Sequence, residues 1–245
     1  MDVVHSVNFT IEPYHLDCFG RVKPSVFLYF AQEAAEDHCH RLGTNWDTMA
    51  EKGLFWAVIR QKLQILRQPQ VGQTVTVQTW PMSTTRVAYP RAAAGFDDQG
   101  NEIFRIISLW VIMDMESRAM VLPGRSGVTV EGSVRGCELE SPGSYVPQQT
   151  NRETLRTVVF SELDKNGHMN NARYLDWLCD LVPSEFHREN PVKSVTVCYH
   201  AEAREGQQIR LSHSLENGVL GLDAHRVQTD VSGKEPRVFT AKMEF

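Results

Sequence analysis

Four polar side chains with the chemistry of a hydrolytic site occur in two short stretches of the chain. Asp164, Asn166 and His168 lie within L-D-K-N-G-H-M-N-N (163–171), and Glu202 lies in H-A-E-A-R-E (200–205). A histidine beside a carboxylate can take a proton from water, and an asparagine can donate a hydrogen bond to a developing oxyanion. These four residues are therefore the candidate catalytic set.

The same residue types also have ordinary structural uses. Asn166-Gly167 is typical of a turn, Asn170 or Asn171 of a helix cap, and Glu202 of a solvated loop. Asp164, His168 and His200 have zinc-binding chemistry, but their spacing matches no established zinc pattern. The sequence therefore predicts no metal and no cofactor.

An internal repeat separates the two interpretations. At an offset of 147 residues, 16–30 and 163–177 share four identities, and at an offset of 134, V-G-Q-T-V-T-V (71–77) matches E-G-Q-Q-I-R-L (205–211). The identities in the first block are Leu16/Leu163, Asp17/Asp164, Gly20/Gly167 and Leu28/Leu175. We expect two copies of one fold at 1–130 and 152–245, joined by a Gly-, Ser- and Pro-rich linker at 131–151.

The two copies differ in their polar residues. Where the second copy has Asn166, His168 and Glu202, the first has Phe19, Arg21 and Gln68. Residues that served only the fold would tend to recur in both copies. This asymmetry favours a catalytic set that is complete only in the second copy.

Each copy shows one helix followed by strands. Pro24 suits the first position of a helix that Gly43 ends, and in the second copy a helix capped by Asn170 or Asn171 stops before Pro183. Alternating segments predict the strands, with turns at 97–100 and 231–233. The predicted strands are 57–65, 71–80, 103–112, 195–197, 209–214 and 238–245. The fold class is α+β, with an antiparallel sheet wrapping each helix.

Composition narrows the class of protein. The 245 residues carry 25 Lys and Arg against 30 Asp and Glu, a formal net charge of −5, which gives no electrostatic reason to expect nucleic-acid binding. No apolar run approaches the roughly 18 residues of a membrane span. Five widely spaced cysteines and the absence of a basic, apolar leader predict reduced thiols and a cytoplasmic location.

The stretch S-E-L-D-K-N-G-H-M-N-N-A-R-Y (161–174) resembles the signature of the acyl-acyl-carrier-protein (acyl-ACP) thioesterases, a tandem double-hotdog family. Three segments of the first copy are also similar to that family: G-L-F-W-A-V-I-R (53–60), V-G-Q (71–73) leading to Thr79-Trp80, and S-L-W-V-I-M-D (108–114). The resemblance covers most of the chain and implies two hotdog domains.

The resemblance implies that Asp164, Asn166, His168 and Glu202 hydrolyse fatty acyl-ACP to free fatty acid and holo-ACP. Plant members have a cysteine directly after the glutamate, where this chain has Ala203, which argues against a cysteine nucleophile. The first copy, which lacks the set, is expected to form the acyl-chain pocket. Its candidate lining residues are Phe27, Phe30 and Trp56.

Alternatives remain open at this point. An acyl-CoA thioesterase is the nearest, because both substrates carry a phosphopantetheine arm. A hotdog enoyl hydratase or dehydratase is disfavoured, because such hydratases resemble D-x-N-x-x-H, whereas His168 lies four residues after Asp164. A non-catalytic acyl-binding protein is a third alternative. The expected partner is an acyl carrier protein, which Arg152, Arg156, Lys165 and Arg173 can attract, and a homodimer is left open.

Overall fold

The computed structural model describes residues 4–130, 132, 137–228, 233 and 235–245. Contacts between residues divide the chain into two compact units, Met1–Pro142 (unit 1) and Gly143–Phe245 (unit 2). The predicted linker at 131–151 includes residues 131 and 133–136, and the predicted turn at 231–233 includes 231 and 232. These seven residues lie outside the described part of the chain.

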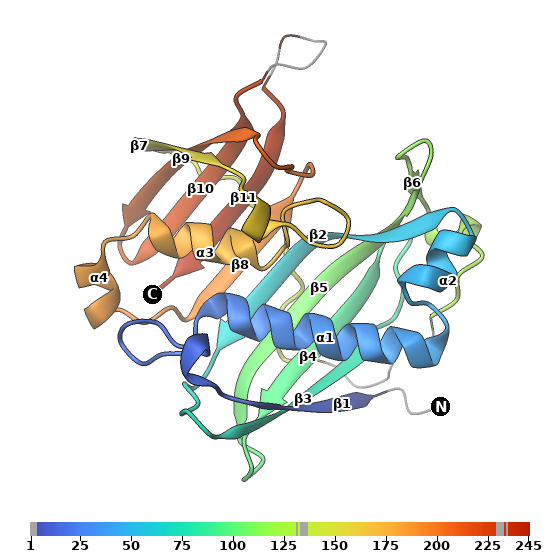
Figure 1. The fold of residues 1–245 in the computed structure, drawn as a ribbon, viewed down its shortest axis with the longest axis horizontal. Coiled ribbons are helices and arrows are strands. Elements are labelled where there is room, and N and C mark those ends of the chain that lie inside the picture. The colour runs from blue at the N-terminus through green and yellow to red at the C-terminus, as the bar shows by residue number, and fades with distance from the viewer. Residues whose placement is uncertain (1–3, 131, 133–136, 229–232, 234) are drawn as a thin grey trace. The chain divides into compact units, whose positions relative to one another are not determined.

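Unit 1 packs a long helix against one face of an antiparallel sheet (Figure 1). The strands lie in the order β1-β3-β4-β5-β2, and the short β6 pairs with β5. The strands are β1 (His5–Thr10), β2 (Leu54–Ile65), β3 (Thr74–Pro81), β4 (Tyr89–Phe96), β5 (Glu102–Asp114) and β6 (Met120–Val121). The helices are α1 (Pro24–Leu42) and α2 (Trp46–Glu51), with 3-10 turns η1 (Pro13–His15) and η2 (Pro123–Arg125).

Unit 2 has the same plan with a shorter helix (Figure 1). Its strands lie in the order β8-β11-β10-β9-β7. They are β7 (Arg152–Thr157), β8 (Ser194–Tyr199), β9 (Gln208–Glu216), β10 (Val219–Arg226) and β11 (Arg237–Glu244). The helices are α3 (Arg173–Asp180) and α4 (Ser184–Glu189), preceded by the 3-10 turn η3 (Phe160–Glu162). Each unit is thus an α+β unit of the predicted kind.

The first helix follows its sequence signals. Pro24 opens α1, where a missing N–H costs nothing, and Gly43 ends it in the left-handed region at φ 64°. Phe27, Ala31 and Ala34 recur at helical spacing and are buried against the sheet. The predicted helix from Pro24 to Gly43 is confirmed.

The second helix differs from its prediction at its start. It begins at Arg173, after Ala172, instead of directly after Asn170 or Asn171. Asn170 takes part as a capping residue, because its Oδ1 accepts a hydrogen bond from the N–H of Ala172 at 2.9 Å. The segment 169–172 is needed for other contacts, since Met169 N–H donates to the carbonyl of Ala203 at 2.8 Å.

The two units share equivalent backbone hydrogen bonds at matching positions of the repeat. The N–H of Ile11 donates to the carbonyl of Gln73, and the carbonyl of Ile11 accepts from Gly72 N–H. Val158 makes the same pair of bonds with Gln207 and Gly206. Short bridges join Leu16 to Val22 and Leu163 to Met169, again 147 residues apart. The predicted offsets of 147 and 134 residues therefore describe equivalent positions in three dimensions.

The chain on either side of the division between the units covers a sheet face of its own unit. In unit 1, Leu139 is buried with Trp80, Ala92 and Ile107. In unit 2, Tyr145 lies over β10 and β11: its carbonyl accepts from Thr240 Oγ1 at 2.5 Å. Its hydroxyl comes within 2.7 Å of where a Cβ on Gly221 would stand, so a larger residue there would clash.

Candidate active site

The loop that carries the predicted catalytic residues is a tight turn closed by Asp164. The Asp164 carboxylate accepts hydrogen bonds from the N–H groups of Asn166 (2.8 Å) and His168 (3.2 Å) through one oxygen, Oδ1. Asp164 N–H donates to the carbonyl of His168 at 2.7 Å, and Gly167 takes φ 72° to complete the turn. This carboxylate therefore holds the backbone of the loop.

Asp17 does the same work in unit 1, where no catalytic set is present. Its Oδ1 accepts from the N–H groups of Phe19 (2.8 Å) and Arg21 (2.9 Å). Because both copies keep the aspartate and both use it in this way, the geometry explains Asp164 as a residue that shapes the turn and positions His168.

His168 and Glu202 come together although they lie on separate loops. His168 Nε2 stands 3.1 Å from Glu202 Oε2, with 18% of the histidine and 36% of the glutamate side chain exposed. A bridge between the backbones of His168 and Arg204 aligns the two loops. The pair is thus shielded enough to be held and open enough to meet a substrate.

The Glu202 side chain is available to contact His168, because the Ala203 carbonyl accepts the hydrogen bond that the side chain of Gln68 accepts in unit 1. In unit 1, Gln68 Oε1 accepts the hydrogen bond of Val22 N–H at 2.9 Å. In unit 2, the equivalent donor, Met169 N–H, is satisfied by the main-chain carbonyl of Ala203. The side chain at position 203 is itself buried, 1% exposed.

Two further groups shape the electrostatics around Glu202. Arg204 Nη2 lies 3.5 Å from Glu202 Oε2 at the exposed side of the loop. The hydroxyl of Tyr174 is buried nearby: burial raises its pKa well above the usual value, the negative charges of Glu202 and Asp164 raise it further, and Arg226 opposes them. Tyr174 is thus a neutral hydroxyl at neutral pH.

Asn166 is exposed at the tip of the turn, between Lys165 and Gly167. Its backbone N–H is held by Asp164, whereas its amide side chain makes no hydrogen bond to another of the described residues. An exposed amide beside His168 suits a group that binds an incoming substrate atom.

The three predicted acyl-pocket residues lie in unit 1. Phe27 is fully buried and packs against Phe104 at 4.9 Å between ring centroids. Phe30 stacks on Phe9 at 4.4 Å. Trp56 is half-buried, and its Nε1 donates to the carbonyl of Thr44 at 2.8 Å. Their contact with an acyl chain stays a prediction.

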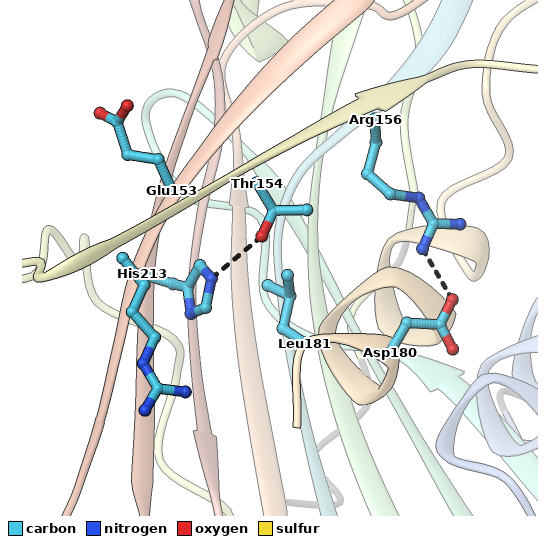
Figure 2. Close-up of a pocket in the computed structure, with 7 residues that line it drawn as sticks. Glu153, Thr154, Arg156, Asp180, Leu181 and His213 are labelled. Atoms are coloured by element: carbon cyan, nitrogen blue, oxygen red, sulfur yellow. Dashed lines mark hydrogen bonds and ion pairs between the residues drawn. The ribbon is translucent and has the colours of Figure 1, made fainter. Parts of the chain in front are cut away.

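A cavity of about 460 Å³ opens beside the edge strand of unit 2 (Figure 2). None of the predicted catalytic or acyl-pocket residues lines it. The lining residues are Arg152, Glu153, Thr154, Arg156, Asp180, Leu181 and His213. His213 is buried and bonds Thr154 Oγ1 at 3.3 Å, while burial and the nearby Arg152 lower its pKa, which keeps the ring neutral.

The basic residues predicted to attract a carrier protein are partly engaged in ion pairs. Arg156 Nη1 lies 2.8 Å from Asp180, and its guanidinium also covers the ring of Trp177. Arg173 pairs with Asp176 one turn along α3 at 3.1 Å. Paired surface charges attract an acidic partner less than unpaired ones do.

Across the described residues, no group of three or more His, Cys, Asp or Glu side chains is placed to hold a metal ion. Of the helices in that same part of the chain, none is long and apolar enough to cross a membrane.

Family comparisons match nearly the whole chain. The family described as "Acyl-ACP thioesterase N-terminal domain" matches residues 2–122, and "Acyl-ACP thioesterase C-terminal domain" matches residues 145–241. The chain belongs to the acyl-ACP thioesterase family. The resemblance seen in the sequence is thereby confirmed.

Solved structures and curated relatives agree with this assignment. An acyl-ACP thioesterase from Bacteroides thetaiotaomicron superposes with a TM-score of 0.88 at 24% identity, covering 100% of this chain and 98% of that one. The 12:0-ACP thioesterase from Umbellularia californica gives 0.83 at 21% identity, covering 100% and 97%. These likenesses confirm the predicted tandem hotdog fold of the family.

A chloroplastic palmitoyl-acyl carrier protein thioesterase of Gossypium hirsutum is 24% identical over 82% of this chain and 52% of its own length. The chain therefore spans about half the length of the curated relatives it matches. That relative is chloroplastic, and the cytoplasmic location of this acyl-ACP thioesterase family member stays a prediction.

The matched aspartates give a testable pair. Asp17→Ala and Asp164→Ala each remove an acceptor of two backbone N–H groups, so each should lower the free energy of unfolding by about 1–2 kcal/mol in chemical denaturation. Asp164→Asn keeps the Oδ1 acceptor and should retain turnover within about tenfold of the unsubstituted protein. A loss of about 10³-fold in a stable Asp164→Asn variant would instead make this carboxylate the general base.

Proposed function

We propose that the chain is a thioester hydrolase that converts fatty acyl-ACP to free fatty acid and holo-ACP. The observation that carries the proposal is the 3.1 Å contact between His168 Nε2 and Glu202 Oε2, in the one repeat that has both residues. Family membership supports the substrate class.

A thioester needs modest help to hydrolyse. Its thiolate leaving group comes from a thiol of pKa about 8.5, so strong general-acid assistance is unnecessary. Two tasks remain: taking a proton from the attacking water and stabilising the tetrahedral oxyanion. Both call for residue types that this loop provides.

The proposed roles are supported by the contact between His168 and Glu202. Glu202 accepts the Nε2–H of His168, which leaves Nδ1 with the lone pair that takes the proton from water. Water oxygen bonds to the thioester carbon, and the carbonyl oxygen becomes an oxyanion that the Asn166 amide stabilises. When the intermediate collapses, the C–S bond breaks and His168 returns the proton to the departing thiolate.

The acyl chain is assigned to unit 1. The proposal is supported by aromatic side chains of unit 1. Phe27 and Phe30 lie on α1, and Trp56 lies on β2 beside the apolar cluster of Met49, Leu54, Tyr89, Ile112 and Val128. Trp56 is the strongest candidate of the three, because it is half-buried and already fixed by its bond to Thr44.

The function is tested with a panel of acyl-ACP substrates of several chain lengths and the matching acyl-CoA thioesters, scored by release of free thiol. We expect turnover of acyl-ACP with a kcat/KM above that of acyl-CoA of the same length. Higher kcat/KM for the CoA series would favour the acyl-CoA thioesterase alternative. No thiol release from either series would leave a non-catalytic acyl-binding protein.

Chain-length preference should respond to unit 1. Phe30→Ala or Trp56→Leu enlarges the space available to the acyl chain. One methylene in an apolar pocket changes the discrimination between two substrates by about 1–3 kcal/mol, so the preferred acyl-chain length should increase. The control is Trp80→Phe, which alters the sheet face opposite α1, where Trp80 packs with Leu139. An unchanged profile in folded Phe30 and Trp56 variants would place the acyl chain elsewhere.

A further inference from the structure

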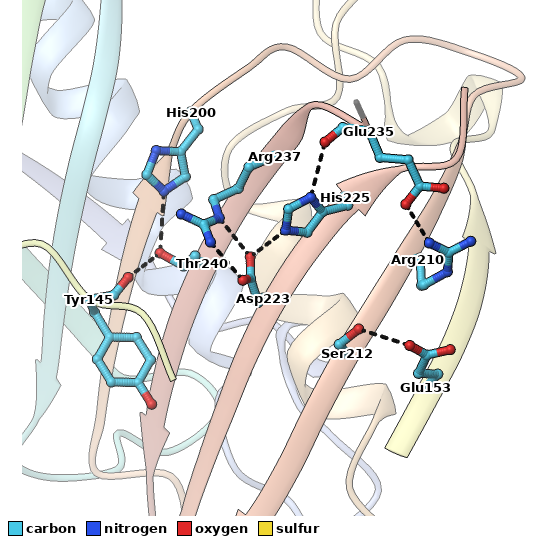
Figure 3. Close-up of polar contacts among 10 residues, drawn as sticks. All are labelled: Tyr145, Glu153, His200, Arg210, Ser212, Asp223, His225, Glu235, Arg237 and Thr240. Carbon is cyan, nitrogen blue, oxygen red and sulfur yellow. Dashed lines mark hydrogen bonds and ion pairs between the residues drawn. The ribbon is translucent and has the colours of Figure 1, made fainter. Parts of the chain in front are cut away.

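Arg226 lies at the end of β10, beside the loop that carries Glu202. It pairs with Ile209 of β9, and its side chain follows Leu222 and Ala224 onto the sheet face that packs against the core. Asp223 and His225 alternate with them and point to the opposite face, where Asp223 bonds Arg237 (Figure 3).

The guanidinium makes one contact that matters for the proposed site. Arg226 Nη2 donates to the main-chain carbonyl of Glu202 at 2.7 Å. The Nε of the same side chain is shielded from solvent and has no hydrogen-bond partner among the described residues. The hydrogen bonding of this arginine is therefore concentrated on the Glu202 carbonyl.

Other backbone hydrogen bonds hold the loop on either side of Glu202, and Arg226 bonds the Glu202 carbonyl between them. Before Glu202, the N–H groups of His200 and Ala201 both donate to the carbonyl of Val238. After it, the carbonyl of Ala203 accepts from Met169 N–H. Between these anchors the peptide that carries the Glu202 side chain is held by the guanidinium.

Unit 1 keeps the outer anchor but lacks the arginine. The N–H groups of Leu66 and Arg67 donate to the carbonyl of Ile103, as in unit 2. Continuing the β3–β4 register one residue past Phe96 places Asp97 where unit 2 has Arg226. The Asp97 carboxylate bonds its own turn instead, at Gln99 and Asn101.

The difference matches the different uses of the two loops. In unit 1 the Gln68 side chain turns inward and fastens its own loop to Val22. In unit 2 the Glu202 side chain contacts His168 and Arg204 instead, and the equivalent donor, Met169 N–H, bonds the carbonyl of Ala203. The loop must then be held through its backbone, which is what Arg226 and Met169 do.

We propose that Arg226 is a positioning residue for the hydrolysis proposed above: by holding the main-chain carbonyl of Glu202, it keeps the Glu202 carboxylate in contact with His168. The inference rests on the proposed function of that pair. A displacement of about 1 Å at a reacting group can cost about 10²-fold in rate, so holding this peptide has a measurable effect.

The test uses the whole chain and acyl-ACP hydrolysis. Arg226→Met should lower kcat by about 10–100-fold with KM changed less than about threefold, because the loop moves while substrate binding elsewhere is kept. Arg226→Lys keeps a donor and a positive charge and should recover part of the loss. The control is Arg237→Met, which removes an ion pair on the opposite sheet face and should lower the melting temperature while leaving kcat within about twofold.

A double variant separates positioning from a merely structural role. If Arg226 acts through Glu202, adding Arg226→Met to Glu202→Gln should lower kcat by less than about threefold beyond the single Glu202 variant. The proposal would be overturned if Arg226→Met lowered kcat in the Glu202→Gln variant by about 10–100-fold, as it does alone. It would also be overturned if a folded Arg226→Met variant kept the kcat of the unsubstituted protein. If Arg226→Met does not fold, Arg226→Lys and Arg226→Gln carry the same comparison. Full activity of Glu202→Gln itself would refute the proposed function, and this inference with it.

Discussion

Replacing His168 by alanine should lower kcat for acyl-ACP hydrolysis by about 10²–10⁴-fold, which is roughly 3–5 kcal/mol of transition-state stabilisation. The reason is that His168 takes the proton from water and later returns it to the thiolate, and unit 1 offers no substitute. Asn166→Ala should act in the same direction through the oxyanion. Release of free thiol under saturating substrate measures both effects.

The matched controls come from the other repeat. Arg21→Ala and Gln68→Ala change the counterparts of His168 and Glu202, so they should leave kcat within a fewfold. Gln68→Ala should cost some stability, because Val22 N–H loses its acceptor. Comparable losses of kcat from the two repeats would contradict a single site in unit 2.

Glu202→Gln should lower kcat by about 10²–10³-fold with little effect on folding. Glutamine keeps the size of the side chain and an oxygen that can accept the Nε2–H of His168, but it removes the charge that stabilises the imidazolium formed during proton transfer. The side chain is partly exposed and leaves the loop anchors intact, since these use the carbonyls of Glu202 and Ala203.

Thermal melting is the control for Glu202→Gln. An unchanged melting temperature with a large loss of kcat places the effect in the chemistry. A Glu202→Gln variant that keeps the turnover of the unsubstituted protein would remove the carboxylate from the mechanism. Arg204→Gln is a useful companion, because Arg204 also approaches Glu202 Oε2 but from the exposed side.

Much of the fold follows from local signals in the sequence. Pro24 and Gly43 bound α1 because their backbone preferences act within a turn, and the repeat at 16–30 and 163–177 marks two copies of one turn. Strands β1, β4, β6, β7 and β10 were not among the predicted strands. The side chains of β4 and β10 do not alternate clearly between apolar and polar. β1 and β7 are short strands at the ends of the strand order, and their places depend on pairing with β3 and β9, which follow later in the chain.

The candidate site was predictable as a set of residue types but not as an arrangement. The asymmetry between Arg21 and His168 and between Gln68 and Glu202 needed only the alignment of the repeats. The sequence shows that Asp17 and Asp164 are equivalent residues, but it does not show their hydrogen bonds. That both carboxylates bond the backbone of their own turns is seen only in the structure. Arg226 was missed because its contact with Glu202 depends on the register of β10.

The central claim is that the His168–Glu202 pair activates water for direct attack on the thioester. Ala203 occupies the position after Glu202, and no predicted role falls on a cysteine, so the competing covalent route is a mixed anhydride on a carboxylate. The most direct measurement is a single turnover in ¹⁸O-water with enzyme in excess over acyl-ACP, followed by mass analysis of the released acid and of the protein. The account predicts one solvent ¹⁸O in the fatty acid of that first turnover and none in the protein. An unlabelled acid with ¹⁸O on Glu202 or Asp164 would contradict it.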